Sequence, residues 1–593
     1  MNRRECDILK ILTQDSYISQ RVLAEISGYS LGLVNRSVKS LRQQGLIDEH
    51  MKVTSAAKEY LRKKSPQNAV ILAAGFGMRM IPINREVPKG LLEVKGEILI
   101  ERIIRQLQEV GIYDIYIVVG FMKERYEYLM DKYQVKLIVN QEYAVKNNLY
   151  SVKCAASYLS NSYIIPCDIW CAKNPFDKHE LYSWYMVSDS NSAESTVRVN
   201  RKLELVTLDD NQEYGNVMIG ICYLEGNQTE NVKNSILRMC KEGRCRDAFW
   251  EEALFEQSHP RLQAKLMHST DVIEINTYTQ LRDIDDKSKH LTSEAVMAIV
   301  DALQVPPNNI NEIEMLKKGM TNRSFLFKCG GKRYIMRIPG EGTERLINRS
   351  NEAVVYQLLN DKEICDKNIY INPLNGYKIT EYLENARVCD PFNQEDVARC
   401  MKKLRSFHRM NLQVEHEFDL FKQISFYESL WDDRSSLYQD YPKTKQGVFS
   451  LKYYIETHAG AKSLTHIDAV PDNFLFVKEA ENESVYLIDW EYAGKQDPHV
   501  DIAMFGIYAL YDRQQMDWML QSYFEGQCTR EDRIKIYCYV AVCGLLWSNW
   551  CEYKRQLGVD FGEYSLRQYR YAKDYYRIVR DELGEERRKW GIK

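Results

Sequence analysis

Residues 464–476 read LTHIDAVPDNFLF, and they place Asp468 and Asn473 among side chains that otherwise belong in a protein core. A second acid, Asp489, follows shortly in VYLIDWEYAG, residues 485–494. Two carboxylates and an amide do not stabilise a core, because burying polar groups without partners costs free energy. Oxygen ligands of this kind suit Mg²⁺, which proteins bind together with substrate phosphates. The stretch therefore predicts a domain built around a metal and a phosphate.

The bulk properties of the chain limit what else it contains. At 593 residues the chain is too long for one hydrophobic core, which predicts about three or four domains. A net charge of −3 excludes a globally basic nucleic-acid binder. The 15 Cys include no CxxC pair, so reduced thiols are expected rather than zinc sites or disulfides, even at Cys167/Cys171 and Cys240/Cys245. The sequence shows neither a membrane-length apolar run nor a signal peptide, which predicts a cytoplasmic protein without membrane contact.

Three segments differ in pattern, and each predicts its own domain. Residues 1–64 consist of short helical stretches, and KKSPQN (residues 63–68) is typical of a linker. Residues 65–288 alternate apolar strands with helical stretches, which predicts a doubly wound α/β sheet. Residues 289–593 open with a strand-rich portion and continue as a long, aromatic-rich helical portion. The chain is therefore expected to be a multidomain α/β and α+β protein.

The first segment has the rhythm of a helix-turn-helix. A helix over Gln20–Ser27, a turn over residues 28–30 and a recognition helix over roughly residues 31–44 are predicted. The spacing predicts one buried face, formed by Leu23, Ile26, Val34, Val38 and Leu41. Three cations point elsewhere, where DNA phosphates or base edges would lie: Arg36, Lys39 and Arg42. The segment resembles the winged-helix family, and either DNA binding or a role in protein contacts and dimerisation remains open.

The second segment has a glycine-rich turn directly after a predicted strand. In LAAGFGMRMIPINREVPKG (residues 72–90), two glycines let backbone N–H groups approach a triphosphate, and an arginine supplies positive charge. Together with the later Pro-Lys pair, the stretch resembles the sugar-phosphate and phosphocholine nucleotidyltransferases. The resemblance implies that Arg79 and Lys89 take part in catalysis. It also implies that an NTP is bound by Ala73, Ala74, Gly75, Gly77, Arg79, Lys89 and, in NNLYS (residues 147–151), Asn148.

The same resemblance implies a divalent ion that holds the α-phosphate of the NTP during attack by a second phosphate. Asp168, at the end of a predicted strand, matches the metal aspartate of these enzymes. Asn276 aligns with their second metal ligand, where the phosphocholine enzymes usually have Asp, and a neutral ligand should weaken Mg²⁺ binding. Trp184 and Trp250 could either enclose a quaternary ammonium or pack in the core.

In the third segment, His466, Asp468, Asn473 and Asp489 follow the kinase pattern H-x-D-x-x-x-x-N with a later metal-binding Asp. Asp468 would accept the proton of a substrate hydroxyl, while Asn473 and Asp489 would hold the Mg²⁺ ions that bridge the ATP phosphates.

Three further stretches of this segment match parts of a kinase nucleotide site. KKGMTNRSFLF (residues 317–327) resembles the loop that covers the phosphates. Arg337 stands where protein kinases carry the strand lysine, and Glu352 is its expected ion-pair partner. Residues 379–383, ITEYL, resemble the hinge that binds adenine, and they include Glu381.

The third segment contains no D-F-G or A-P-E signature, so it differs from protein kinases and resembles the choline/ethanolamine and aminoglycoside kinase family. LLWSNWCEYKRQLG (residues 545–558) is similar to bacterial choline kinases in particular. Trp547 and Trp550 lie about one turn apart on one helix. They are expected either to pack in the core or to form an aromatic cage for trimethylammonium, with Trp490 or Glu491 nearby.

Together the resemblances imply two consecutive reactions: phosphorylation of choline by ATP, then coupling of phosphocholine to CTP, with Mg²⁺ in both sites. Two alternatives remain open. The same folds could act on ethanolamine, an aminophosphonate or a sugar phosphate, and with an NTP other than CTP. The chain could instead be a DNA-binding regulator whose enzyme domains only sense metabolites, which predicts salt-sensitive DNA binding and negligible turnover.

Overall fold

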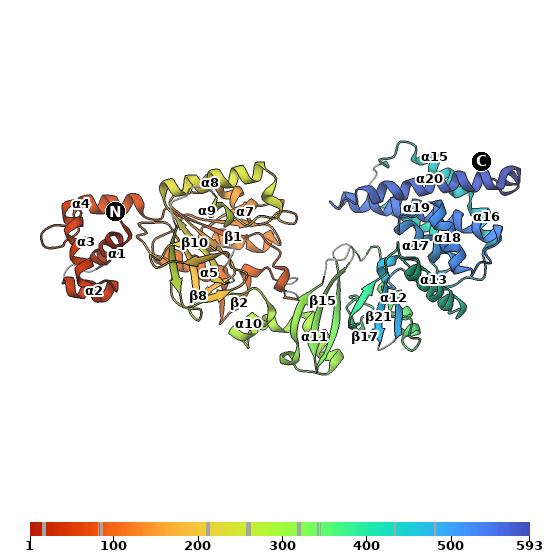
Figure 1. Cartoon of the computed structure of the whole chain (residues 1–593), viewed down its shortest axis with the longest axis horizontal. Coiled ribbons are helices and arrows are strands. Elements are labelled where there is room, and N and C mark those ends of the chain that lie inside the picture. The colour runs from red at the N-terminus through yellow and green to blue at the C-terminus, as the bar shows by residue number, and fades with distance from the viewer. Residues whose placement is uncertain are drawn as a thin grey trace. The chain divides into compact units, whose positions relative to one another are not determined.

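The computed structural model describes residues 1–14, 19–80, 82–83, 87–208, 214–256, 262–316, 322–340, 343, 345–431, 435–479 and 482–592. The chain forms two compact units, residues 1–297 and 298–593 (Figure 1). The predicted phosphate-covering loop begins with residues 317–321, which lie outside the described residues. Within the described ranges no helix is both long and apolar enough to cross a membrane, including the 27-residue α19 (Arg530–Gln556).

The first unit begins with a helical module. Its helices are α1 (Arg3–Gln14), α2 (Gln20–Ser27), α3 (Leu31–Gln43) and α4 (Ser55–Lys64). α2 starts at Ser19, whose side chain accepts a hydrogen bond from the Val22 N–H, and it ends at Gly28, which has a φ of 68°. A bridge between Ile47 and Val53 closes a short wing before α4. The predicted helix-turn-helix is confirmed.

The buried face of this module differs from the prediction at one position. Leu23, Val34, Val38 and Leu41 are buried, but 56% of the surface of Ile26 is exposed. α2 has eight residues, and Leu23 is the one it buries in the module core. The side chain of Ile26 therefore lies at the flank of α2, and its predicted burial is wrong.

A seven-stranded mixed sheet forms the centre of the rest of this unit, in the order β12-β8-β11-β6-β1-β4-β5. The neighbours β6, β1, β4 and β5 are parallel, whereas β11 is antiparallel to both β6 and β8. The strands are β1 (Asn68–Ala73), β4 (Ile115–Val119), β5 (Lys136–Val139), β6 (Ser162–Pro166), β8 (Trp184–Ser192), β11 (Gly215–Leu224) and β12 (Gln263–Met267). The predicted α/β sheet is confirmed, with an antiparallel portion on one side.

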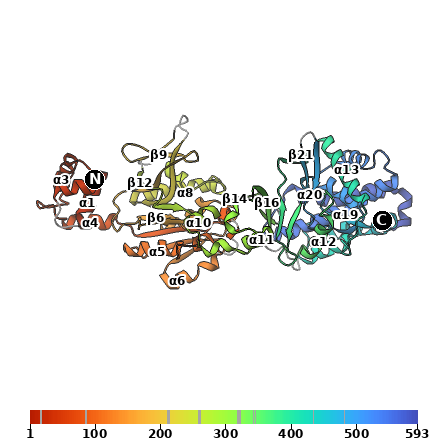
Figure 2. The same ribbon diagram turned by 90° about the horizontal axis from the view of Figure 1, so that it is seen from below.

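Helices cover both faces of this sheet (Figures 1 and 2). Successive side chains of a strand point to opposite faces, so a strand covered on both sides is apolar throughout. Ile71 of β1 belongs to the core that contains residues of α5 (Leu99–Glu109). Its neighbour Val70 belongs to the core that contains residues of α7 (Asn148–Ala155) and α8 (Gly226–Lys241).

The carboxyl ends of the parallel strands carry the polar loops of this unit, which is where open α/β sheets bind ligands. The glycine-rich turn follows β1, and Asp168 follows β6. β13 (Val272–Glu274) pairs with β7 (Ile169–Cys171), and the Ile275 N–H donates to the Asp168 carbonyl at 3.0 Å. This pairing brings the residues around β13 to the same edge as Asp168.

The second unit opens with a five-stranded antiparallel sheet in the order β14-β15-β16-β18-β17. Its strands are β14 (Asn311–Met315), β15 (Asn322–Cys329), β16 (Lys332–Pro339), β17 (Asn368–Ile371) and β18 (Lys378–Glu381). α12 (Arg349–Leu359) follows β16 in the chain and is capped by Asn348, whose side chain accepts two backbone N–H groups. The predicted strand-rich portion is confirmed.

The remainder of this unit is helical, apart from two small sheets. The loops that connect their strands contain Asp468 and Asp489. β20 (Ser463–Thr465) pairs with β23 (Gly494–Gln496), and β21 (Phe474–Glu479) pairs with β22 (Asn482–Leu487). The long helices are α13 (Gln394–Arg409), α17 (His499–Tyr508), α18 (Arg513–Tyr523), α19 and α20 (Glu563–Leu583). α19 and α20 approach closely at Gly544, where a Cβ would lie 2.7 Å from the Gln568 carbonyl oxygen.

Candidate active sites

The loop after β20 is fixed by a buried acid on α17. The Asp501 carboxylate accepts the backbone N–H groups of His466 at 3.0 Å and of Ile467 at 2.7 Å. Nε2 of the His466 ring donates to the carbonyl of Ile488 at 2.9 Å. Burial lowers the pKa of His466 to about 4, so the ring is neutral near pH 7. These bonds hold together the two acid-bearing stretches, residues 464–476 and 485–494.

Asp468, Asn473 and Asp489 line one cavity of about 520 Å³. The Asn473 amide donates to the backbone carbonyl of Asp468 at 2.9 Å and to its carboxylate at 3.4 Å. Burial, followed by the charge of Asp489, raises the pKa of Asp468 to about 8. Burial, followed by the charge of Glu491, raises the pKa of Asp489 to about 7. Buried carboxylates that repel each other across a cavity fit a divalent cation, which would relieve the repulsion.

Arg337 and Glu352 form the predicted ion pair between β16 and α12. Both guanidinium Nη atoms contact the carboxylate, and the Nη2–Oε2 distance is 2.8 Å. Burial opposes ionisation of Glu352, but the charge and hydrogen bonds of Arg337, together with the charges of Lys378 and Arg349, outweigh it, and the pKa of Glu352 falls to about 2. Arg337 also donates to the carbonyl of Gly376 at 3.0 Å and lines the cavity. The guanidinium is thus held in one orientation at the cavity wall.

Glu491 is tied into the same buried network through Arg349, a residue that the sequence reasoning missed. Nη1 of Arg349 lies 2.9 Å from Glu352 and 3.1 Å from Glu491. The Asn322 amide donates to Glu491 at 2.8 Å. Glu491 lines the cavity, but its carboxylate already has a cation and an amide as partners, so the structure disfavours it as the counter-charge for a quaternary amine. The i, i+3 spacing of Arg349 and Glu352 was the signal that could have identified the arginine.

Glu381, at the end of β18, does not line the cavity, whereas its neighbour Thr380 does. The Glu381 carboxylate lies 2.9 Å from Lys332 and 3.8 Å from Lys367, and its N–H donates to the Lys367 carbonyl at 3.0 Å. The Glu381 side chain and N–H are therefore engaged by other protein groups, which disfavours them as the adenine contacts of the expected hinge.

Aromatic side chains form part of the cavity wall near the acids. Trp547 and Trp550 of α19 line it, with ring centroids 5.5 Å apart. Three tyrosines that the sequence reasoning missed also line it: Tyr492, Tyr508 and Tyr564. Tryptophan and tyrosine faces attract cations, so this wall suits a quaternary ammonium.

Trp490 is not part of that wall. It is fully buried, its Nε1 donates to the carbonyl of Leu487 at 2.7 Å, and it packs against His466 and Phe407. The expectation that Trp490 contributes to an amine cage is therefore corrected. Trp490 and Glu491 lie in the turn after β22, where the Ala493 N–H donates to the Trp490 carbonyl at 3.2 Å. Within this turn Glu491 lines the cavity, whereas Trp490 packs in the core.

Lys89 lies at the centre of the candidate site in the first unit. Its ammonium contacts the Asp168 carboxylate and lies 2.5 Å from the Asn276 amide oxygen. Gly77, with a φ of 60°, lies directly against this side chain, because a Cβ there would be 3.4 Å from Lys89 Cδ. Oδ1 of Asp168 is buried and has no hydrogen-bond partner among the described residues. An unsatisfied carboxylate oxygen beside an amide oxygen fits a divalent cation.

Glu274 is a second acid in this site that the sequence reasoning missed. Burial, followed by the charge of Asp168, raises its pKa, and a hydrogen bond with Asn276 and the charges of Lys89 and Arg79 oppose the rise. Glu274 and Asn276 are two residues apart at the end of β13. Residues at that spacing in an extended chain share a side, and this spacing could have identified Glu274.

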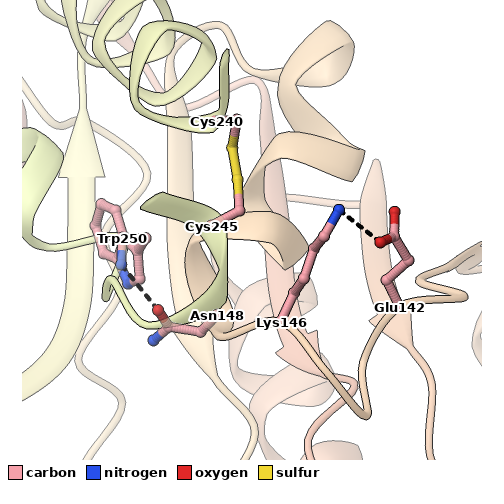
Figure 3. Close-up of a disulfide and its surroundings, with 6 residues drawn as sticks. All are labelled: Glu142, Lys146, Asn148, Cys240, Cys245 and Trp250. Carbon is pink, nitrogen blue, oxygen red and sulfur yellow. Dashed lines mark hydrogen bonds and ion pairs between the residues drawn. A yellow bond between two sulfur atoms is a disulfide. The ribbon is translucent and has the colours of Figure 1, made fainter. Parts of the chain in front are cut away.

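Asn148 is used to hold its own segment in place (Figure 3). Its Oδ1 accepts the backbone N–H of Trp250 at 2.8 Å. The preceding Asn147 N–H donates to the carbonyl of Cys245 at 3.0 Å.

Cys245 forms a disulfide with Cys240, at the end of α8, so the expectation of reduced thiols throughout is wrong at this pair. The turn after α8 brings the two Cα atoms within 5.0 Å, which makes the bond possible.

Trp184 and Trp250 occupy packing positions, as the second of the two predicted roles requires. Both are buried, with 2% and 1% of their surfaces exposed. The ammonium of Lys265 lies 4.2 Å from the Trp184 ring centroid, and the Trp250 ring packs against Tyr185. The structure therefore disfavours both as walls of an amine site.

The cations of the recognition helix differ in their surroundings. Arg36 and Lys39 are exposed on α3. Arg42 donates to the carbonyls of Asp48 at 3.3 Å and Glu49 at 2.9 Å, so it fixes the turn after the helix.

Among the described residues, no group of three or more His, Cys, Asp or Glu could hold a metal ion, so both candidate cation sites combine acids with an amide.

Three family models match separate stretches of the chain. Residues 313–540 match the choline/ethanolamine kinase family. Residues 69–176 match the MobA-like NTP transferase domain, and residues 1–48 match the winged helix-turn-helix DNA-binding domain.

Individual proteins are similar to the two larger parts. The choline-phosphate cytidylyltransferase of Streptococcus pneumoniae is 29% identical over 227 residues, which cover 37% of this chain and 98% of the relative. Protein LicA of Haemophilus influenzae is 27% identical over 265 residues, which cover 42% of this chain and 76% of the relative. The crystal structure of choline kinase LicA from Streptococcus pneumoniae is 30% identical, covers 47% of this chain and 96% of its own, and has a TM-score of 0.42.

Proposed function

Because this chain carries a winged helix-turn-helix domain, a MobA-like NTP transferase domain and a choline/ethanolamine kinase domain, we propose that it is a bifunctional transferase of phosphocholine metabolism. The kinase domain phosphorylates choline with ATP. The transferase domain couples phosphocholine to CTP and releases CDP-choline and pyrophosphate. The proposed bounds of the three domains are residues 1–64, 65–288 and 289–593.

One observation carries the kinase assignment: the acids and the aromatic side chains line the same cavity. In the proposed reaction Asp468 takes the proton of the choline hydroxyl. The choline oxygen bonds to the γ-phosphorus of ATP, and the bond from that phosphorus to ADP breaks. Trp547 and Trp550 receive the trimethylammonium group through cation–π contacts. Asn473 and Asp489 would hold Mg²⁺, which neutralises phosphate charge when bound.

The cytidylyltransferase assignment is supported by the cation and the oxygen ligands that meet at the edge of the β-sheet. A phosphate oxygen of phosphocholine bonds to the α-phosphorus of CTP, and pyrophosphate leaves. Lys89 and Arg79 neutralise the triphosphate. Asp168, with Asn276 and Glu274, would hold Mg²⁺, so the neutral amide at Asn276 is accompanied by two acids.

The test is product analysis by ³¹P NMR with the full-length protein, ATP, CTP, choline and Mg²⁺. Asp468→Asn should make no phosphocholine but should still make CDP-choline from added phosphocholine. Asp168→Asn should accumulate phosphocholine without CDP-choline. Asp390→Asn, at an exposed acid of the second unit, is the control and should perform both steps. If either active-site variant keeps the step assigned to it, that assignment fails. Replacing choline by ethanolamine in the same assay tests the choice of amine.

A DNA contact is proposed for the amino-terminal domain, supported by the exposure of Arg36 and Lys39 on α3. Binding of a mixed-sequence duplex should weaken steeply as salt is raised. Replacing both cations with Ala should reduce the affinity and flatten that salt dependence. Equal affinity in the double variant would exclude α3 as the DNA-contacting helix.

A further inference from the structure

A second large cavity, of about 800 Å³, lies in the first unit where the winged-helix module meets the α/β domain. The module contributes residues of α1, the wing and α4, and the α/β domain contributes residues 110–112 and 178–179. Residues 110–112 precede β4 and residues 65–66 precede β1, so the cavity lies at the amino ends of these strands. The candidate catalytic site lies at the carboxyl ends, and the two share no lining residue.

The two sides of this cavity are held together by specific contacts. Lys10 of α1 lies 3.0 Å from Asp177 and 3.2 Å from Glu180. The Tyr182 hydroxyl donates to Asp7 at 2.8 Å. The walls therefore come from one packed structure, and the acids that flank residues 178–179, Asp177 and Glu180, are paired with a module lysine.

The cavity lining is strongly cationic. Lys58 and Arg62 lie one turn apart on α4, and Lys178 faces the same space from the α/β domain. None of the described lining residues is Asp or Glu. Within the described part of the chain, Lys58, Arg62 and Lys178 do not lie within ion-pair distance of a carboxylate, whereas the adjacent Lys63 pairs with Glu59 at 2.9 Å. Three like charges that share a concave surface favour an anionic occupant.

The remaining walls limit what that anion can be. His179, whose Nδ1 lies 3.0 Å from the Ser65 hydroxyl, supplies a polar group. Leu61, Val110 and Ile112 supply apolar surface. The volume lies in the range of pockets that bind a small organic ligand. A lining that combines cations with apolar side chains suits a phosphate-bearing molecule that also has an organic part.

Resting on the proposed use of CTP by the transferase domain, we infer that this cavity is a second, non-catalytic nucleotide site, in which Lys58, Arg62 and Lys178 bind the phosphates of a cytidine nucleotide and the apolar side chains contact its organic part. A ligand there contacts both the wing and the α/β domain, so its binding changes how firmly the module is held. The site would thus connect the nucleotide supply of the transferase domain with the state of the winged-helix module.

The test measures the rate at which each lysine of the full-length protein is modified by an amine-reactive reagent, resolved by peptide mass spectrometry. The probes are CTP, CDP-choline, inorganic phosphate and a mixed-sequence DNA duplex, each used alone. At about ten times its Kd, CTP or CDP-choline should slow modification of Lys58 and Lys178 about tenfold. Lys89 reports occupancy of the catalytic site in the same sample.

Three variants separate this site from the catalytic one. Arg62→Ala should abolish protection of Lys58 and Lys178 while CTP still protects Lys89, which also shows that the variant is folded. Lys63→Ala is the matched control on the same helix and should behave as the parent. Lys89→Ala should leave the protection of Lys58 and Lys178 in place.

Several outcomes would overturn the inference. Unchanged modification of Lys58 and Lys178 with both cytidine nucleotides would show that no such site exists. Protection by inorganic phosphate alone would exclude the nucleotide class. Protection by the DNA duplex alone would assign these lysines to DNA. Protection that survives in Arg62→Ala, or that disappears in Lys89→Ala, would show that CTP acts from elsewhere.

Discussion

Asn276 stands where the proposed metal site of the first unit is expected to have an acid, and Glu274 restores the missing charge. The two side chains are hydrogen-bonded, and burial together with the charge of Asp168 raises the pKa of Glu274. Bringing two acids together in this way costs free energy without a cation and favours binding when one arrives. The presence of Asn276 in place of the expected Asp is therefore compatible with activity.

Glu274→Gln tests this compensation. Loss of the second negative charge should lower the rate of CDP-choline formation about tenfold to a hundredfold and raise the Mg²⁺ concentration needed for half the maximal rate. Phosphocholine formation by the other domain should not change. Glu252→Gln removes an acid that pairs with Arg244 at the surface, and it is the control. An unchanged Mg²⁺ requirement in Glu274→Gln would contradict the proposed role.

Glu251 predicts a pH dependence of stability in the first unit. Burial raises its pKa from 4.5 to about 7, and hydrogen bonds to the carboxylate offset only part of that rise. The folded state therefore binds a proton that the unfolded state has lost between pH 4.5 and 7, so stability falls as pH rises through this range. One such group corresponds to about 3 kcal/mol in the free energy of unfolding. Chemical denaturation at pH 5 and pH 8 measures the change.

Glu251→Gln should remove this contribution, because the amide stays neutral at every pH. The variant should gain stability relative to the parent at pH 8 but not at pH 5. Glu252→Gln should follow the pH profile of the parent. Parallel profiles for the parent and Glu251→Gln would show that Glu251 is ionised in the folded protein.

At the scale of elements, α12 is attached to the segment after β22 through Arg349, which bonds to both Glu352 and Glu491. Removing one partner of a buried charge network leaves the others uncompensated. Arg349→Met should therefore lower the free energy of unfolding of the second unit by about 3 kcal/mol, measured by denaturation. The KM for ATP should rise more than kcat falls, because the cavity wall at Arg337 loses a support. Arg333→Met removes a surface pair with Glu384 and should have little effect.

The elements themselves could be predicted because their signals are local. The recognition helix is expected to begin at residue 31 and does so, and the alternation of apolar strands with helical stretches expected for residues 65–288 is found in β1, β4 and β6. Asp468 and Asn473 are five residues apart in one local motif, which predicts that their side chains lie close together. The pairing of Arg337 with Glu352 is expected because both residues match positions of the kinase nucleotide site.

What the sequence did not reveal depends on partners distant in the chain. Trp490 and Glu491 are adjacent, but packing against Phe407 and bonding to Arg349 decide which role each can take. The spacing of Cys240 and Cys245 in the sequence does not indicate a disulfide, because it is the turn after α8 that brings the two residues together. Ile26 has the spacing of a buried residue, yet more than half of its surface stays exposed.

At the scale of the whole molecule, the chain divides into two compact units, and the two proposed reactions are assigned to different units. Residues 1–292 and 293–593, produced separately, should each perform one step: CDP-choline formation from phosphocholine and CTP, and phosphocholine formation from choline and ATP. The cut keeps Leu291, whose carbonyl accepts from the Tyr278 hydroxyl at 3.2 Å, in the first fragment and leaves α11 (Glu294–Leu303) intact in the second. Initial rates measured for each step should match those of the full chain within about twofold, since compact domains keep their own cores. Loss of either step on separation would show that the domains support each other.

The contact of Lys89 with Asp168 and Asn276 has a consequence for the order of events. Without substrate, the Lys89 ammonium is the counter-ion of the Asp168 carboxylate. Mg²⁺ that binds alone must therefore compete with this ammonium group for the same oxygen ligands. A triphosphate offers that ammonium a new partner and brings its own magnesium. The pocket should thus accept the ion and the nucleotide together, and a metal titration without CTP should give little heat.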